Sequence, residues 1–261
     1  MRADESPRLW HLAVSNFNEK ARWALDYKRV PHRRRAMEPG PHMAVALALT
    51  GRSITFPVLQ VGGRRAVGGS SAIIAELERR YPQRPLYPAD PEARRRALEL
   101  EAHFDQNYGE HVRCVGFWEL FKEPKYLGLG EAQGKVFAAL TGLRFSIDEE
   151  SAARSLVKVR EGLDLIEETL GDGDHLVGDE FTVADLAACA LTGPVLRPPE
   201  LPYGFAKMQI PESLRRISDE IRERPAGRWM LRTYSRYRYP SPEQAAREQR
   251  RPAAAGFVRV A

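Results

Sequence analysis

The sequence predicts an α/β domain followed by an all-helical domain, within a chain of 261 residues. Strand and helix patterns alternate through the first part of the chain, which is typical of a mixed sheet covered by helices. Four prolines then fall within residues 82–91, where a helix cannot continue. No convincing strand follows. The predicted divisions are an α/β domain at 1–82, a linker at 83–91, a helical domain at 92–238 and a loosely ordered tail at 239–261.

The α/β domain is expected to contain four short strands and three helices. Strands are predicted at residues 9–14, 32–36, 56–59 and 64–67. Helices are predicted at residues 17–29, 43–49 and, after a start rich in Gly and Ser, about 70–81.

The helical domain is predicted from apolar residues that recur at helical spacing. The clearest case is the segment 149–170, where one face carries Leu156, Val159, Leu163, Ile166 and Leu170. Thr182 and Asp185 form a capping box that opens a further helix. The other predicted helices cover residues 92–121, 128–142, 211–222 and 226–236. Residues 196–209 are rich in proline and are expected to be irregular.

Composition narrows the class of protein. Hydrophobic residues make up 43% and charged residues 29% of the chain, which is typical of a globular protein. No apolar run reaches the roughly 18 residues of a membrane span, and the N-terminus has no apolar signal core. The two cysteines form no disulfide framework. We therefore expect a cytoplasmic protein with no membrane partner.

The first 82 residues are basic, with 14 Lys and Arg against 7 Asp and Glu. This charge would attract an anionic ligand, although an Arg-rich surface with no such role is the better explanation. No basic motif interleaved with aromatic residues is present, so we expect no nucleic-acid partner.

Two segments together predict a clamp for a small peptide. Pro57 opens a strand, and a proline there lacks an N–H and is often cis, which leaves the backbone of Phe56 available to another chain. Gly69, Ser70 and Ser71 open a helix, whose first N–H groups attract an anion. The pair of segments predicts the binding of an extended peptide that carries a carboxylate.

Ser15 is the candidate catalytic residue. It lies between the first strand and the first helix, where backbone N–H groups and the helix dipole favour a nearby anion. A hydroxyl that donates to a thiolate there lowers the pKa of the thiol. From the local sequence alone, however, an ordinary N-cap is the better explanation of this serine.

These segments, in this order, resemble the glutathione transferases. Residues 15–22 resemble the family turn Ser/Cys-Pro-Phe-x-x-Lys-x-Arg, and residues 176–185 are similar to its helical-domain signature. Residues 196–200 and 225–229 are similar to a bacterial branch of the family. The resemblance implies a thioredoxin-like first domain, a homodimer and no metal. It also implies detoxification, in which glutathione or another low-molecular-weight thiol attacks an electrophilic small molecule as co-substrate.

The resemblance also implies roles for single residues. Ser15 would activate the bound thiol, Phe56 and Pro57 would pair with its cysteinyl amide, and Ser70 would hold its γ-glutamyl carboxylate. Further contacts to the thiol peptide are predicted at Asn18, Gly69 and Ser71. Because Ser15 and Asn18 occupy the places of two cysteines in redox-active relatives, disulfide exchange is disfavoured.

The predicted site departs from the family at Gly69, where relatives usually carry Glu, Asp or Gln. An acidic partner for the ammonium group of glutathione is therefore missing, and Asp105 of a neighbouring subunit is one candidate to replace it. His103, Asn107 and His111 share a helical face but lack a metal-ligand pattern. That face could border the second-substrate cavity, with Tyr108 and His111 as candidate contacts.

Two other functions remain open on the same scaffold. Gly69 favours a non-catalytic binding or interaction protein. A thiol-dependent isomerase or dehalogenase would use the same thiol site with a different pocket. In each enzymatic case the electrophile is expected to lie against the helical domain, beneath residues 196–209.

Overall fold

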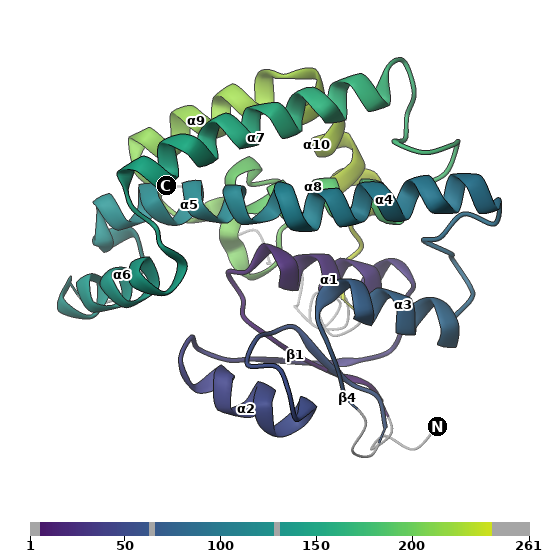
Figure 1. The fold of residues 1–261 in the computed structure, drawn as a ribbon, viewed down its shortest axis with the longest axis horizontal. Helices are drawn as coiled ribbons and strands as arrows, with labels where there is room; N and C mark the ends of the chain where they lie inside the picture. The colour runs from purple at the N-terminus through teal and green to yellow at the C-terminus, as the bar shows by residue number, and fades with distance from the viewer. Residues whose placement is uncertain (1–5, 63–65, 128–130, 242–261) are drawn as a thin grey trace, which may run out of the picture.

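The computed structural model describes residues 6–62, 66–127 and 131–241, and consists of a small mixed sheet with helices on both faces beside a helical layer (Figure 1). The sheet order is β2-β1-β3-β4, with β1 parallel to β2 and antiparallel to β3. The elements of this first domain are β1 (Arg8–His11), α1 (Asn16–Tyr27), β2 (Arg33–Ala36), α2 (Pro41–Thr50), β3 (Val58–Gln60), β4 (Ala66–Gly68) and α3 (Ser70–Arg80).

The alternation of side chains in β1 determines how the helices cover the sheet. Leu9 and His11 are buried on the face covered by α1 and α3, whereas Trp10 packs with the α2 side of the sheet. Figure 1 shows α1 and α3 between the sheet and the helical layer, with α2 on the opposite face. This is the thioredoxin-like α/β domain that the sequence predicts.

The second domain is entirely helical in its described residues. The buried helix α8 (Val183–Leu196) contacts α1 of the first domain as well as four helices of its own layer, α4, α5, α9 and α10. Its neighbours are α4 (Pro91–Asn107), α5 (Gly109–Lys122), η1 (Pro124–Leu127), α6 (Glu131–Phe145), α7 (Glu149–Leu170), η2 (Pro202–Lys207), α9 (Glu212–Glu223) and α10 (Pro225–Tyr237). Within the described ranges, no helix is both long and apolar enough to cross a membrane.

One predicted helix, at residues 92–121, is divided in the structure. The chain leaves helical geometry at Tyr108, between α4 and α5. Tight packing accompanies this break: an added Cβ at Gly109 would lie 3.0 Å from Leu191 of α8 and 3.1 Å from Phe17 of α1. The Tyr108 ring is buried in the helical domain, and its hydroxyl lies 2.8 Å from Thr192 Oγ1.

The remaining predicted elements shift by a few residues at their ends. The first strand ends at His11 because the chain turns between β1 and α1. The fourth strand is found at Ala66–Gly68, while Arg64 and Arg65 of the prediction lie outside the described residues. Residues 242–261 of the predicted tail also lie outside them.

A buried ion network joins the two domains. Arg238, which follows α10, donates to Glu19 Oε1 over 2.6 Å and to Asp26 Oδ2 over 2.7 Å, and both carboxylates belong to α1. Glu19 also accepts from Arg22 over 2.7 Å, and Asp26 pairs with Arg34 of β2. Burial alone would raise the pKa of Glu19, but Arg238 and Arg22 hold it below its usual value. The last described turn of the chain is thereby fixed to the first helix.

We expect Arg238→Met to lower the free energy of unfolding by about 3–5 kcal/mol, because it leaves two buried carboxylates without their shared partner. Urea denaturation measures the change. Arg232→Met, at an exposed position of α10, is the matched control and should change stability by less than about 0.5 kcal/mol. Equal losses in the two variants would show that the network does not stabilise the domain interface.

Candidate functional site

The site is built around the turn that ends β1 and begins α1. Ser15 is the N-cap of α1, with extended backbone angles, and its Oγ accepts from the Asn18 N–H over 3.4 Å. The side chain is half-buried. A serine hydroxyl that accepts a bond still has its own proton to donate. The cap role and an interaction with a thiolate are therefore compatible.

Arg22 holds this turn in place. Its Nη1 donates to the Leu12 carbonyl over 3.0 Å, and its Nη2 donates to the carbonyls of Ala13 and Ser15 over 3.2 and 3.4 Å. Three carbonyls of one turn therefore converge on a single guanidinium. Such a planar fork of donors fixes their relative positions.

Asn18 connects the turn to the second segment of the predicted clamp. Its Oδ1 accepts from the Leu12 N–H over 3.1 Å, and its Nδ2 donates to the Phe56 carbonyl over 3.2 Å. The side chain is 0% exposed. Because Asn18 is buried and both ends of its amide are bonded to the backbone, its position is that of a support for Phe56 rather than of a surface contact.

The strands β3 and β4 bring the two halves of the predicted clamp together. The Phe56–Pro57 peptide bond is cis, and Val58 is paired with Gly68 in the antiparallel ladder. The Gly69 N–H donates to the Pro57 carbonyl over 2.9 Å. Gly69 is exposed and has φ +91°, and Ser70 begins α3 beside it. The proline turn and the α3 N-terminus are thus neighbours.

Asp105 on α4 is engaged within its own chain. Its carboxylate accepts from the Ser71 hydroxyl over 2.5 Å and from the Lys20 ammonium over 2.7 Å. Glu101 lies 2.7 Å from the same Lys20 nitrogen, and the Lys20 side chain is 0% exposed. Within this chain, the charge of Asp105 neutralises the buried Lys20 next to α3. Its predicted contact with glutathione bound to a neighbouring subunit stays a prediction.

The structure does not bring the two other predicted contacts to this site. Tyr108 is 0% exposed, and burial raises the pKa of its hydroxyl. His111 lines a separate cavity of the helical domain. Among the described residues, no group of three or more His, Cys, Asp or Glu side chains is arranged to hold a metal ion.

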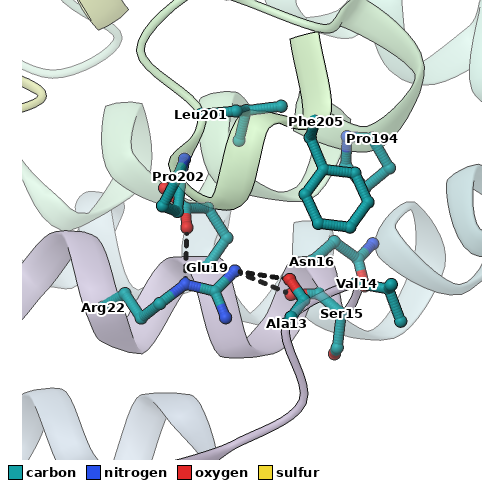
Figure 2. A pocket seen from close by; sticks show the side chains of 10 residues that line it. All are labelled: Ala13, Val14, Ser15, Asn16, Glu19, Arg22, Pro194, Leu201, Pro202 and Phe205. Atoms are coloured by element: carbon teal, nitrogen blue, oxygen red, sulfur yellow. Dashed lines mark hydrogen bonds and ion pairs between the residues drawn. The ribbon is translucent and has the colours of Figure 1, made fainter. Parts of the chain in front are cut away.

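A small cavity lies directly beside Ser15. Figure 2 shows the Phe205 ring above Val14 and Ser15, with the Ser15 hydroxyl directed away from that ring. The cavity volume is about 20 Å³, close to the minimum of roughly 10–15 Å³ that admits one water. Its apolar walls come from both domains, namely Ala13, Val14, Pro194, Leu201, Pro202 and Phe205. Residues 201–205 thus form a roof over this narrow space.

Two sets of contacts hold the roof in place. Arg197 Nη2 donates to the carbonyls of Phe205, Ala206 and Met208 over 3.1, 2.9 and 2.5 Å. On the other side, the Tyr203 ring stacks on His11 with 5.5 Å between centroids, and its hydroxyl lies 3.1 Å from His11 Nε2.

The protonation of His11 follows from its neighbours. Burial, together with Arg22 and Arg34, lowers the pKa of His11 to about 3, so the imidazole is neutral near pH 7. Arg22 Nη1 lies 3.0 Å from Nδ1, and a guanidinium can only donate. Nδ1 is therefore the acceptor, and the proton on Nε2 is donated to the Tyr203 oxygen.

Asn16 ties the start of α1 to the helical domain. Its Nδ2 donates to the Gly109 carbonyl over 2.9 Å and to the Leu191 carbonyl over 3.1 Å. Its Oδ1 accepts from the Phe17 N–H over 3.0 Å. The residue after Ser15 therefore links the turn to α5 and α8.

Sequence reasoning missed the supporting residues of the site. Arg22 and Lys20 are visible in the motif that the sequence shares with the transferases, and that motif could have identified them. His11 and Tyr203 have no local signal, because their contact spans 192 residues of sequence.

The sequence matches known family models in both of its domains. The family model described as glutathione S-transferase, N-terminal domain, matches residues 9–85, and the model described as glutathione S-transferase, C-terminal domain, matches residues 118–215. The chain belongs to the glutathione transferase superfamily. No curated protein matches it.

Several solved structures share the fold. A glutathione S-transferase from Methylobacterium radiotolerans, solved in complex with glutathione sulfonate, is 27% identical with a TM-score of 0.53, over 87% of this chain and 94% of that one. The beta-etherase LigF from a Sphingobium strain is 19% identical with a TM-score of 0.61, over 87% and 99%. A transferase from Ceriporiopsis subvermispora, in complex with glutathione, is 15% identical with a TM-score of 0.65, over 89% and 97%.

For this member of the superfamily, we expect Tyr203→Phe to loosen the roof. The variant keeps the stacked ring and loses a hydrogen bond worth about 1 kcal/mol, so amide exchange in residues 201–208 should accelerate about fivefold. Hydrogen–deuterium exchange with mass spectrometry measures this rate. Tyr81→Phe, just after α3, serves as the matched control and should leave it unchanged. An unchanged rate in Tyr203→Phe would mean that the His11 contact does not hold the roof.

Proposed function

We propose that this chain is a transferase that activates glutathione, or a similar low-molecular-weight thiol, for attack on an apolar electrophilic small molecule. The observation that carries the proposal is the Ser15 hydroxyl at the start of α1, half-buried and with its proton still available for donation. A hydroxyl donor and the N-terminal end of a helix both stabilise a thiolate relative to a thiol. The protein would thus activate a bound thiol rather than use a thiol of its own.

The peptide part of the thiol would lie along Phe56, Pro57, Gly69 and Ser70. The Phe56 backbone would pair with the cysteinyl amide, and the first N–H groups of α3 would hold the γ-glutamyl carboxylate. Asn18 would act indirectly, through its bond to the Phe56 carbonyl. The glutathione sulfonate bound by the Methylobacterium radiotolerans transferase supports this choice of ligand.

The electrophile would occupy the cavity beneath residues 201–205. Its walls are mainly apolar and come from both domains, which favours a flat, apolar molecule such as an aryl halide. Because the cavity holds little more than one water, the electrophile would fit only when the roof moves. We also propose that the protein is a homodimer, as its resemblance to the glutathione transferases implies.

One feature favours a non-catalytic binding protein instead. Gly69 offers no carboxylate for the ammonium group of glutathione, and Asp105 is already bonded to Lys20 and Ser71. If the thiol does not bind, the scaffold would serve another ligand. Calorimetric titration with glutathione, repeated with other cellular thiols, distinguishes the two functions, because only the transferase requires a bound thiol.

Ser15→Ala should lower turnover of an aryl halide at least about tenfold, which corresponds to a loss of about 1.4 kcal/mol of transition-state stabilisation. Thiol affinity should change only a few-fold, and the pH-rate profile should move to higher pH because the bound thiol becomes less acidic. Ser15→Thr retains the hydroxyl and the cap, and should keep most of the activity. Unchanged turnover in Ser15→Ala would assign thiol activation to another group.

Gly69→Glu should strengthen glutathione binding about tenfold, since a charge-assisted hydrogen bond contributes about 1.5–3 kcal/mol. No atom lies within 4 Å of an added Cβ, so space is available. The positive φ of Gly69 should nevertheless lower stability by about 1–2 kcal/mol. Calorimetry and urea denaturation measure the two effects.

Gly69→Gln is the matched control for that substitution, because it carries the same strain without the charge. Equal affinities for the Gln and Glu variants would exclude the missing carboxylate as the cause of weak binding. If neither variant nor the unaltered protein binds glutathione, the transferase proposal fails for this thiol.

A further inference from the structure

A second cavity lies in the helical domain, between α5, α7 and the turn that joins α6 to α7. Its volume is about 160 Å³, much larger than that of the cavity beside Ser15. A cavity of roughly 150 Å³ can hold one benzene-sized ring. The space is therefore sufficient for a one-ring organic molecule.

The walls of this cavity combine apolar and polar side chains. Phe145 at the end of α6 and Ile147 in the α6–α7 turn supply apolar surface, and His111 and Ser155 supply polar atoms from α5 and α7. His111 Nδ1 lies 3.1 Å from Ser155 Oγ, and Ser155 is buried. Because these two polar groups already hold each other, this wall is preformed, as in most small-molecule sites.

The charge in the cavity is carried by Arg113. Its guanidinium lies 4.4 Å from the centre of the Phe145 ring, and that of Arg144 lies 5.2 Å from the same ring. Burial lowers the pKa of Arg113, Glu110 and Cys114 oppose this effect, and Arg144 adds to it. The environment therefore disfavours the positive charge that Arg113 must carry.

Glu110 compensates that charge only in part. Its carboxylate is 3.8 Å from Arg113, longer than a hydrogen bond, and its side chain is 62% exposed. Solvent screens an ion pair of this kind strongly. Arg113 thus lines the cavity with a charge that Glu110 neutralises only weakly, so it can pair with a further anion bound there, whereas the exposed Arg144 is not part of the lining.

We infer that this cavity binds a small aromatic carboxylate of about the size of benzoate. The ring lies against Phe145 and Ile147, and the carboxylate accepts from the guanidinium of Arg113, whose planar fork matches its two oxygens. The inference is independent of the thiol chemistry proposed for Ser15, since none of the residues that line this cavity lines the other.

Cys114 provides a reporter inside the same cavity. Its thiol lines the space, with Sγ 3.9 Å from Ser151 Oγ. The chain has one other cysteine, Cys189, which is 0% exposed, and burial raises the pKa of its thiol well above the usual value. A thiol reagent applied to the native protein therefore modifies Cys114 selectively.

The experiment follows the alkylation of Cys114 by iodoacetamide in the full-length protein, quantified by mass spectrometry across a benzoate titration. Half-protection is expected at about millimolar benzoate, as is usual for so small a ligand. At twice that concentration the rate should fall about threefold. Benzamide has the same ring without the charge, and acetate has the charge without the ring. Both should protect far less than benzoate.

Arg113→Gln should abolish protection by benzoate, whereas Arg154→Gln, an equivalent change on the exposed face of α7, should leave it intact. Thermal melting shows whether each variant is folded. If Arg113→Gln does not fold, the comparison of benzoate with benzamide on the unaltered chain still shows whether the carboxylate is required for binding. Equal protection by benzamide, no protection by benzoate at about 50 mM, or full protection in a folded Arg113→Gln would each overturn the inference.

Discussion

The contacts of Arg22 are the constraint on which the candidate site depends. Its guanidinium holds three carbonyls of the turn that presents Ser15, and its Nε is paired with Glu19. Glu19 in turn binds Arg238 at the end of the helical domain. A buried charge with fewer partners would be costly, so the geometry of the turn and the docking of the two domains are stabilised together.

The fold could be predicted from the sequence wherever the signal was local. The helix predicted at residues 149–170 is found as α7 with the same bounds, because its apolar face and the caps that flank it, Asp148 and Gly171, are all local in sequence. The break between α4 and α5 could not be predicted in the same way. It coincides with the tight packing of Leu191 and Phe17 against Gly109, and these residues come from distant parts of the chain.

The site was predictable only in its outline. Ser15, Pro57 and Ser70 could be placed from short motifs, since each depends on the start of a strand or helix. The roof residue Tyr203 could not, because its partner His11 belongs to the other domain and no pattern near Tyr203 marks the contact. Asn18 was predicted as a contact to the thiol peptide, but its burial and its bond to the Phe56 carbonyl became visible only in the folded chain.

The hydrogen bonds of Asn16 limit which structural changes this superfamily member can tolerate. Its amide donates to main-chain carbonyls of Gly109 and Leu191, not to their side chains. Every residue supplies such a carbonyl, so the link itself requires no particular side chain, although packing against Leu191 and Phe17 still favours glycine at position 109. A small rigid displacement of those helices would break it without any substitution. The turn that carries Ser15 is therefore sensitive to the relative placement of the domains, and the side chains that face it matter through packing rather than through this hydrogen bond.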